Sequence, residues 1–139
     1  MNNRDCTDTS PTEKPNANHG TKKSTMARKP VSTNASAASG FWKDTTKIMQ
    51  FPKEGIYSTV LAKSETYNYT LMCLAGGTTI DTHTSAKAGI VYVIKGKGTF
   101  ALAGATIPLM PGTFIFMQKN APHSLDASED LALLLCLTE

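Results

Sequence analysis

Two adjacent segments decide the fold of this chain: Gly77-Thr78-Thr79-Ile80-Asp81-Thr82-His83-Thr84-Ser85 and Gly89-Ile90-Val91-Tyr92-Val93-Ile94-Lys95-Gly96-Lys97-Gly98. Each reads as a short β-strand, a loop joins the two, and a glycine turn closes the second. Because side chains alternate along a strand, Asp81, His83 and Ser85 are expected on one face. A second histidine, His123, opens a later strand. The rest of the chain is expected to build a scaffold around these two histidines.

Further short apolar runs follow the same strand pattern, and Gly, Pro and Asn turn signals separate them. The expected strands cover residues 56–62, 67–75, 79–84, 90–95, 99–102, 105–110, 113–117, 123–126 and 131–138. Residues 45–50 fit either one helical turn or an edge strand. Many short strands at regular spacing, without a long helix, predict an all-β sandwich or barrel.

The opening segments resemble the first motif of the cupin superfamily. That motif places a glycine, a His-x-His pair, a glutamate and a closing glycine at fixed spacing. Gly77, His83 and Gly96 fall on its positions, whereas Ser85 replaces the second histidine and Gly89 replaces the glutamate.

A second cupin motif can be traced further along the chain, where Gly112 and His123 match it. Gln118, Asn120 and Ala127 stand where the family has proline, glycine and asparagine. The resemblance covers roughly residues 56–138. It implies a double-stranded β-helix, a jelly-roll cupin barrel, with both motifs facing each other inside.

The resemblance also implies a metal site. In cupins the two motif histidines ligate one ion, so His83 and His123 are the expected metal ligands, with Zn, Fe, Ni or Mn as the expected divalent transition metal. Catalytic metal sites usually have three protein ligands, and Asp81 is the candidate third ligand or catalytic base. The alternative is that both histidines are neutral and hydrogen-bond in a pocket with Asp81, Ser85 or water.

The aromatic residues of the strands allow two interpretations. Tyr92, Phe100, Phe114 and Phe116 can line an apolar ligand cavity, because small-molecule sites are mostly apolar. They can also fill the core or form a dimer face. A small barrel must fill its interior with side chains, which favours the second interpretation.

Two classes of function follow. The first is an enzyme-like cupin that binds a small molecule in the barrel, for which the family implies dioxygenase, isomerase or lyase chemistry. The second is a non-catalytic cupin, a ligand-binding or sensor module whose metal site has decayed. The loss of two family ligands favours the module, and the retention of both remaining histidines favours the enzyme.

Residues 1–40 differ from the rest in composition. They contain no aromatic residue and almost no large aliphatic residue, so a disordered tail is expected there, followed by a barrel domain at 41–139. The tail holds six Lys/Arg and three Asp/Glu, and the domain holds eight of each. The net charge of +3 therefore belongs to the tail, and the neutral domain is not expected to bind nucleic acid.

Cysteine usage and hydropathy bound the location and the partners. Three widely spaced cysteines indicate a reducing cytoplasm rather than a disulfide framework. No apolar run is long enough to span a bilayer, so no membrane partner is expected. Phe41, Trp42 and the run Leu131–Leu137 supply more apolar surface than one small barrel is expected to bury, which predicts a homodimer.

Overall fold

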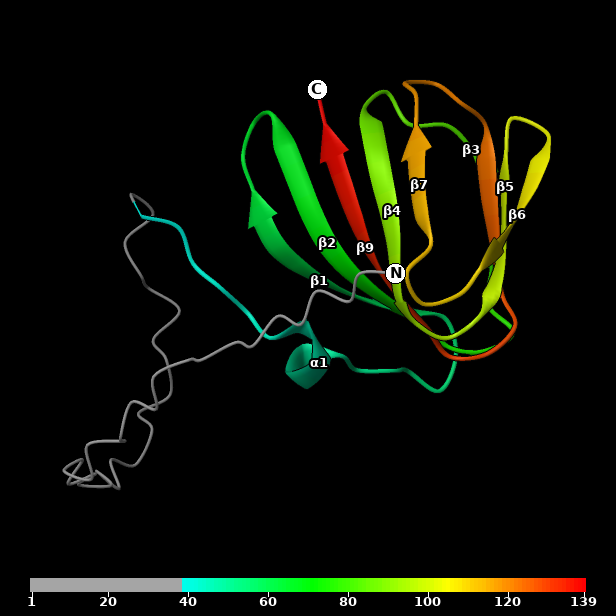
Figure 1. Ribbon diagram of the computed structural model, residues 1–139, viewed down its shortest axis with the longest axis horizontal. Helices are drawn as coiled ribbons and strands as arrows, with labels where there is room; N and C mark the ends of the chain where they lie inside the picture. Colours follow the sequence, from blue (N-terminus) through cyan, green and yellow to red (C-terminus); the bar gives the residue numbers. More distant parts are fainter. Residues whose placement is uncertain (1–38) are drawn as a thin grey trace, which may run out of the picture. The chain divides into compact units, whose positions relative to one another are not determined.

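Two antiparallel sheets face each other in the part of the chain that the structure, a computed structural model, describes, residues 39–139 (Figure 1). The strands are β1 (Ile56–Lys63), β2 (Tyr67–Leu74), β3 (Thr79–His83), β4 (Ala88–Lys95), β5 (Gly98–Leu102), β6 (Ala105–Leu109), β7 (Phe114–Met117), β8 (His123–Ala127) and β9 (Leu131–Thr138). The larger sheet has the order β1-β2-β9-β4-β7 and the smaller sheet the order β3-β8-β5-β6. The prediction of an all-β jelly-roll barrel is confirmed. The predicted disorder of residues 1–40 falls almost wholly outside the described residues and stays a prediction.

The core lies between the two sheets. Along β7 the side chains alternate strictly between exposed and buried, with Ile115 and Met117 turned inward. The other inner-face residues of the larger sheet, from β2, β9 and β4, are Leu74, Leu131, Leu133, Val91 and Val93, and those of the smaller sheet include Phe100, Leu109 and Leu125. This two-residue period is what places one apolar set of each strand in the barrel.

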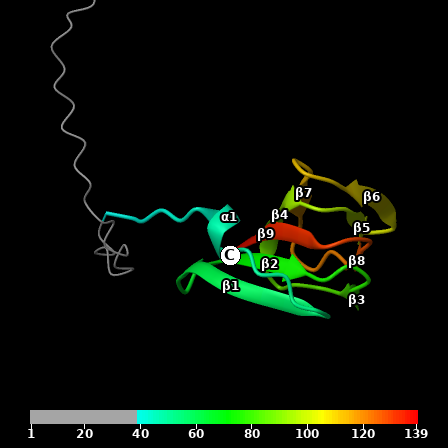
Figure 2. The ribbon, with the colours of Figure 1, turned by 90° about the horizontal axis from the view of Figure 1, so that it is seen from below.

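Helix α1 (Thr45–Ile48) is a single turn. Of the two alternatives for residues 45–50, the helical turn is therefore correct and the edge strand is not. The Asp44 side chain caps it by accepting a hydrogen bond from the Thr46 backbone N–H at 3.1 Å. Ile48 packs against the outer side of the larger sheet, and Figure 2 shows α1 beside β2 and β9. Within residues 39–139, no helix is both long and apolar enough to cross a membrane.

Candidate functional site

The two motif histidines are cross-strand neighbours. His83 is the last residue of β3, His123 is the first residue of β8, and the two residues pair directly in the sheet. Their ring centroids are 4.2 Å apart with an angle of 61° between the planes. His123 is 8% exposed and stacks on the buried Phe100 ring at 5.8 Å, whereas His83 is exposed. The pair therefore joins one solvent-facing imidazole to one held by the core.

Both imidazoles are oriented by the same local hydrogen bond. His83 Nδ1 lies 2.8 Å from the Asp81 carbonyl oxygen, and His123 Nδ1 lies 2.8 Å from the Ala121 carbonyl oxygen. A carbonyl oxygen only accepts, so each Nδ1 must carry the hydrogen and donate it. In the neutral ring the lone pair then belongs to Nε2, the atom able to ligate a metal or take up a proton.

Strand alternation does not place the Asp81 carboxylate beside the two histidines. The register shifts between Ile80, which pairs with Leu125, and His83, which pairs with His123. Ile80 and His83 are three positions apart on β3, but their partners Leu125 and His123 are only two apart on β8, so β3 accommodates one extra residue between them. Strict alternation fails here, and it is the backbone carbonyl of Asp81 that contacts the histidine. A ligand or base role for its side chain stays a prediction.

Ser85, which stands in the place of the family's second histidine, accepts hydrogen bonds that hold two loops. Its hydroxyl oxygen accepts a hydrogen bond from the Lys87 backbone N–H at 3.1 Å, and its carbonyl oxygen accepts one from the Asn120 N–H at 2.7 Å. Asn120 has φ 61°, the left-handed conformation that asparagine tolerates better than most residues. This explains why Asn can stand where the motif has glycine, and the bond ties the two motif loops together.

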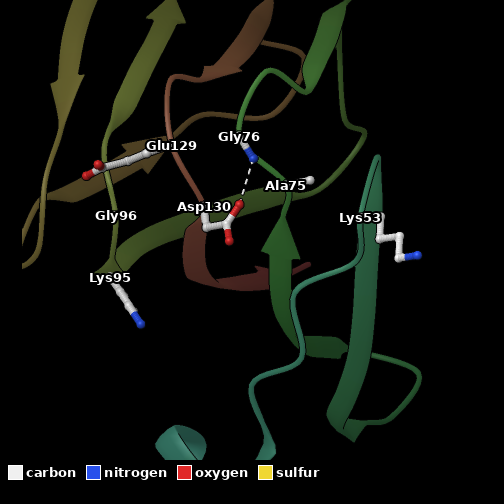
Figure 3. A pocket seen from close by; sticks show the side chains of 7 residues that line it. All are labelled: Lys53, Ala75, Gly76, Lys95, Gly96, Glu129 and Asp130. Atoms are coloured by element: carbon white, nitrogen blue, oxygen red, sulfur yellow. Dashed lines mark hydrogen bonds between the residues drawn. The ribbon is translucent and has the colours of Figure 1, made fainter.

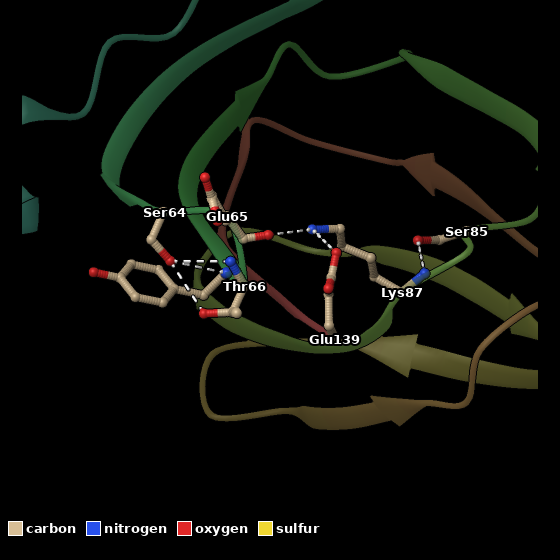
Figure 4. A network of polar contacts seen from close by, with 7 residues as sticks. Ser64, Glu65, Thr66, Ser85, Lys87 and Glu139 are labelled. Atoms are coloured by element: carbon tan, nitrogen blue, oxygen red, sulfur yellow. Dashed lines mark hydrogen bonds and ion pairs between the residues drawn. The ribbon is translucent and has the colours of Figure 1, made fainter.

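Further polar contacts hold the loop that follows His83 (Figure 4). The Lys87 ammonium lies 3.0 Å from the Glu139 carboxylate and donates to the Glu65 carbonyl oxygen at 3.4 Å. The loop after β3 is thereby connected to the β1–β2 turn and to the end of β9.

Gly89, in the place of the family's glutamate, faces an occupied space. A Cβ built there would lie 2.7 Å from Leu137 Cδ2 and 3.1 Å from Met117 Cε. Met117 is buried in the core, so apolar side chains fill the route that a glutamate would take. In residues 39–139, no group of three or more His, Cys, Asp or Glu side chains is arranged to hold a metal ion.

Only one of the four strand aromatics lies beside the histidines, namely Phe100. Tyr92, Phe114 and Phe116 are on the outer face of the larger sheet and exposed. The interpretation that these three line a ligand cavity is therefore wrong, as is the interpretation that they fill the core.

A separate hollow of about 710 Å³ lies where β3 begins and β8 ends, away from the histidines at the other ends of these strands, and Figure 3 shows its lining. It is lined by Lys53, Ala75, Gly76, Lys95, Gly96, Glu129 and Asp130. Sequence reasoning did not single it out. The Asp130 carboxylate accepts a hydrogen bond from the Gly76 N–H at 2.9 Å, and Lys95 Nζ lies 5.5 Å from the Phe51 ring centroid. Asp130 and Lys95 therefore already contact other parts of the fold. Strands β3 and β8 run from this hollow to the histidines.

The pairing of both motif histidines in a jelly roll agrees with the comparison to known proteins, in which a sequence family described as a cupin domain matches residues 70–137. The chain is a member of the cupin superfamily.

Several solved structures have a fold similar to that of this chain. A conserved protein of unknown function from Streptococcus pyogenes is 23% identical, with a TM-score of 0.66 over 71% of this chain and 87% of that chain. A predicted oxalate decarboxylase from Thermotoga maritima is 22% identical, with a TM-score of 0.56 over 60% and 79%. Salicylate 1,2-dioxygenase from Pseudoaminobacter salicylatoxidans is 20% identical, with a TM-score of 0.57 over 60% and 26%. At this identity, the likeness establishes the fold of this cupin.

One relative is more similar in sequence, but only over a short stretch. L-ectoine synthase from Desulfatibacillum aliphaticivorans is 46% identical over 46 residues, which is 32% of this chain. The matched stretch spans 35% of the length of that relative.

Proposed function

We propose that this cupin binds a small molecule at the His83–His123 pair and that the two Nε2 atoms hold a divalent transition metal weakly. The observation that carries the proposal is the matched pair of Nδ1–carbonyl hydrogen bonds, which leave two Nε2 lone pairs on adjacent rings. Preorganised imidazoles of this kind suit Zn, Fe or Ni.

The residues present fit a two-imidazole site and do not fit the four-ligand site of the family. Ser85 uses its hydroxyl oxygen within the loop, and Gly89 has no side chain. Water or atoms of the bound molecule would have to complete the coordination shell, so the affinity for the ion alone should be modest.

The chain's own residues supply orientation and a site for a proton. Phe100 supports the His123 ring, and when no ion is bound the exposed His83 Nε2 can take up a proton from a bound molecule. A bound ion would add Lewis-acid polarisation of an oxygen on that molecule. Enzyme-like chemistry of the dioxygenase, isomerase or lyase class is the form of this proposal that the family resemblance favours.

The second candidate is a non-catalytic ligand-binding or sensor module. The observation that favours it is the apolar filling in front of Gly89, where Leu137 and Met117 occupy the space of a lost ligand. A module of this kind would bind its small molecule without turning it over.

Titration calorimetry with Zn²⁺, Ni²⁺, Mn²⁺ and, without oxygen, Fe²⁺ tests the metal site. The wild type should bind with modest affinity that weakens on acidification, because protonated imidazole cannot ligate. His83→Ala and His123→Ala should each abolish this binding, and His19→Ala, which removes the third histidine of the sequence, should leave it unchanged. No heat with the wild type at millimolar metal would refute the metal site.

Tight stoichiometric binding would instead mean that another side chain contributes, and Asp81→Asn would then test the predicted third ligand. To separate the enzyme from the module, the metal-loaded wild type and His123→Ala are incubated with candidate oxygen-donor ligands that raise the melting temperature. Product formation by the wild type alone supports an enzyme, and stabilisation without turnover supports the module.

A further inference from the structure

The hollow at the end of the barrel away from the histidines is lined by turns that hydrogen-bond to one another. The Gly77 N–H donates to the Ala127 carbonyl oxygen at 2.7 Å, which joins the β2–β3 turn to the end of β8. The Ser128 and Glu129 N–H groups both donate to the Lys97 carbonyl oxygen, at 3.1 and 3.3 Å, which joins the β8–β9 turn to the β4–β5 turn. The walls of the hollow are therefore held in place by the backbone.

Charged side chains of both signs line this hollow. Lys53 and Lys95 contribute two ammonium groups, and Glu129 and Asp130 contribute two carboxylates. All four residues are exposed, and none of the four forms an ion pair with another residue in the described part of the chain. The hollow thus combines unpaired charges that sum to zero.

Two of these groups are held in position without being neutralised. The Asp130 carboxylate accepts a hydrogen bond from the Gly76 N–H through Oδ1, at 2.9 Å, so its second oxygen still has both lone pairs for a ligand. Lys95 Nζ lies 5.5 Å from the Phe51 ring centroid, a cation–π contact that leaves the N–H groups of the ammonium free to donate. The hollow therefore offers one positioned anion and one positioned cation.

We propose that this hollow binds a small zwitterion, a molecule such as a free amino acid that carries both an ammonium group and a carboxylate. The ligand's ammonium donates to the Asp130 carboxylate, and the ligand's carboxylate accepts from the Lys95 ammonium. The Lys53 ammonium adds to the attraction for that carboxylate. The volume of about 710 Å³ is within the usual range for small-molecule sites.

Ligands with charges of one sign fit this hollow less well. A ligand with carboxylates alone would meet the Asp130 carboxylate, and a ligand with ammonium groups alone would meet Lys53 and Lys95, and like charges at close range repel. A zwitterion instead finds a partner for each of its charges. The hollow is remote from the histidine pair, so the proposal does not depend on the proposed function.

Titration of the ¹⁵N-labelled full chain, followed in ¹H–¹⁵N correlation spectra, tests the proposal. The probes 4-aminobutyrate, butyrate and butylamine share a four-carbon chain and carry both charges, the carboxylate alone and the ammonium alone. Glycine and β-alanine are zwitterions of shorter span. At least one zwitterion should shift the amide signals of Gly76, Gly96 and Asp130. Because exposed ion pairs contribute little, it should bind at millimolar concentration, about 5-fold more tightly than either singly charged probe.

Two charge variants and their matched controls locate the site. Asp130→Asn removes the charge and keeps an oxygen that can accept from the Gly76 N–H, and Lys95→Met keeps an unbranched side chain. Each should weaken binding of the zwitterion about 5-fold. Glu129→Gln and Lys97→Met remove the same charges nearby and should leave binding unchanged, because Figure 3 shows the Glu129 carboxylate directed away from Asp130 and Lys97 does not line the hollow.

Three results would overturn the proposal, provided that each variant retains the dispersed spectrum of the folded chain. The first is that no zwitterion shifts the signals of the hollow at millimolar concentration. The second is that butyrate or butylamine binds there as tightly as the best zwitterion. The third is that Asp130→Asn and Lys95→Met weaken binding no more than their controls do.

Discussion

Replacement of glycine by alanine at Gly89 and at Gly96 should reduce the stability of the fold by very different amounts. At Gly89 a new methyl group would approach the ends of the Leu137 and Met117 side chains, at 2.7 and 3.1 Å. At Gly96 it would collide with the backbone carbonyl oxygen of Asp130 and lie 2.8 Å from the carbonyl carbon. Side-chain ends can rotate away from a methyl group, whereas a backbone carbonyl can move only with its strand.

The magnitudes follow from this difference. Overpacking a core by one methyl costs about 1–3 kcal/mol, and replacing a strand glycine by alanine recovers about 0.5–1 kcal/mol of chain entropy. Gly89→Ala should therefore reduce the free energy of unfolding by about 1 kcal/mol. Gly96 has φ 89°, where a side chain costs about 1–2 kcal/mol, and the backbone collision adds to this. Gly96→Ala should lose more than about 4 kcal/mol, a loss that few single substitutions cause.

Gly112→Ala separates the two contributions at Gly96. Gly112 has φ 92°, close to the value at Gly96, but a Cβ there would have no atom within 4 Å. Its substitution should cost only the conformational part, about 1–2 kcal/mol. The excess loss in Gly96→Ala then measures the contact with Asp130.

Urea unfolding at a fixed protein concentration, monitored by circular dichroism, gives all three values. For a domain of this size, 1 kcal/mol corresponds to a change of roughly 4–8 °C in melting temperature, so thermal melts offer a second readout. The reasoning would be refuted if Gly96→Ala were no less stable than Gly112→Ala, or if Gly89→Ala were the least stable of the three.

Three further predictions concern the thiols, a loop and the N-terminal residues. Burial raises the pKa of the Cys73 and Cys136 thiols, so at neutral pH both should react more slowly with iodoacetamide than in the urea-unfolded chain, and faster as the pH rises; equal rates by mass spectrometry would contradict this. Asn120→Ala should lose about 1 kcal/mol of stability because of its positive φ, and Asn120→Gly should not; a loss with glycine as large as that with alanine would show that the side chain itself matters. Deleting residues 1–40 should leave the melting temperature within a few degrees, since such a segment is expected to bury little; a large drop would contradict the predicted disorder.

The sequence by itself determined where most strands begin and end, and it singled out His83 and His123 as the residues of the candidate site. The predicted strand at 56–62 is observed as β1 (Ile56–Lys63), and the predicted 131–138 is observed as β9 with the same ends. Between the predicted strands 105–110 and 113–117, the Pro111-Gly112 turn is closed by the Thr113 N–H, which donates to the Met110 carbonyl oxygen at 3.0 Å. These features depend on local periodicity and turn chemistry, which short stretches of sequence carry. The spacing of the two motifs likewise predicted that His83 and His123 lie close together, and their ring centroids are 4.2 Å apart.

Other features were decided only by the tertiary structure. In Phe114-Ile115-Phe116-Met117 both alternating sets are apolar, so periodicity could not say which set faces the core. The shift between Ile80 and His83 is a property of the pairing with β8 and leaves no local signal. Likewise, the crowding at Gly89 comes from β9 and β7, which are distant in sequence. Side-chain direction and free space depend on which strands become neighbours, and that is settled when the two sheets pack.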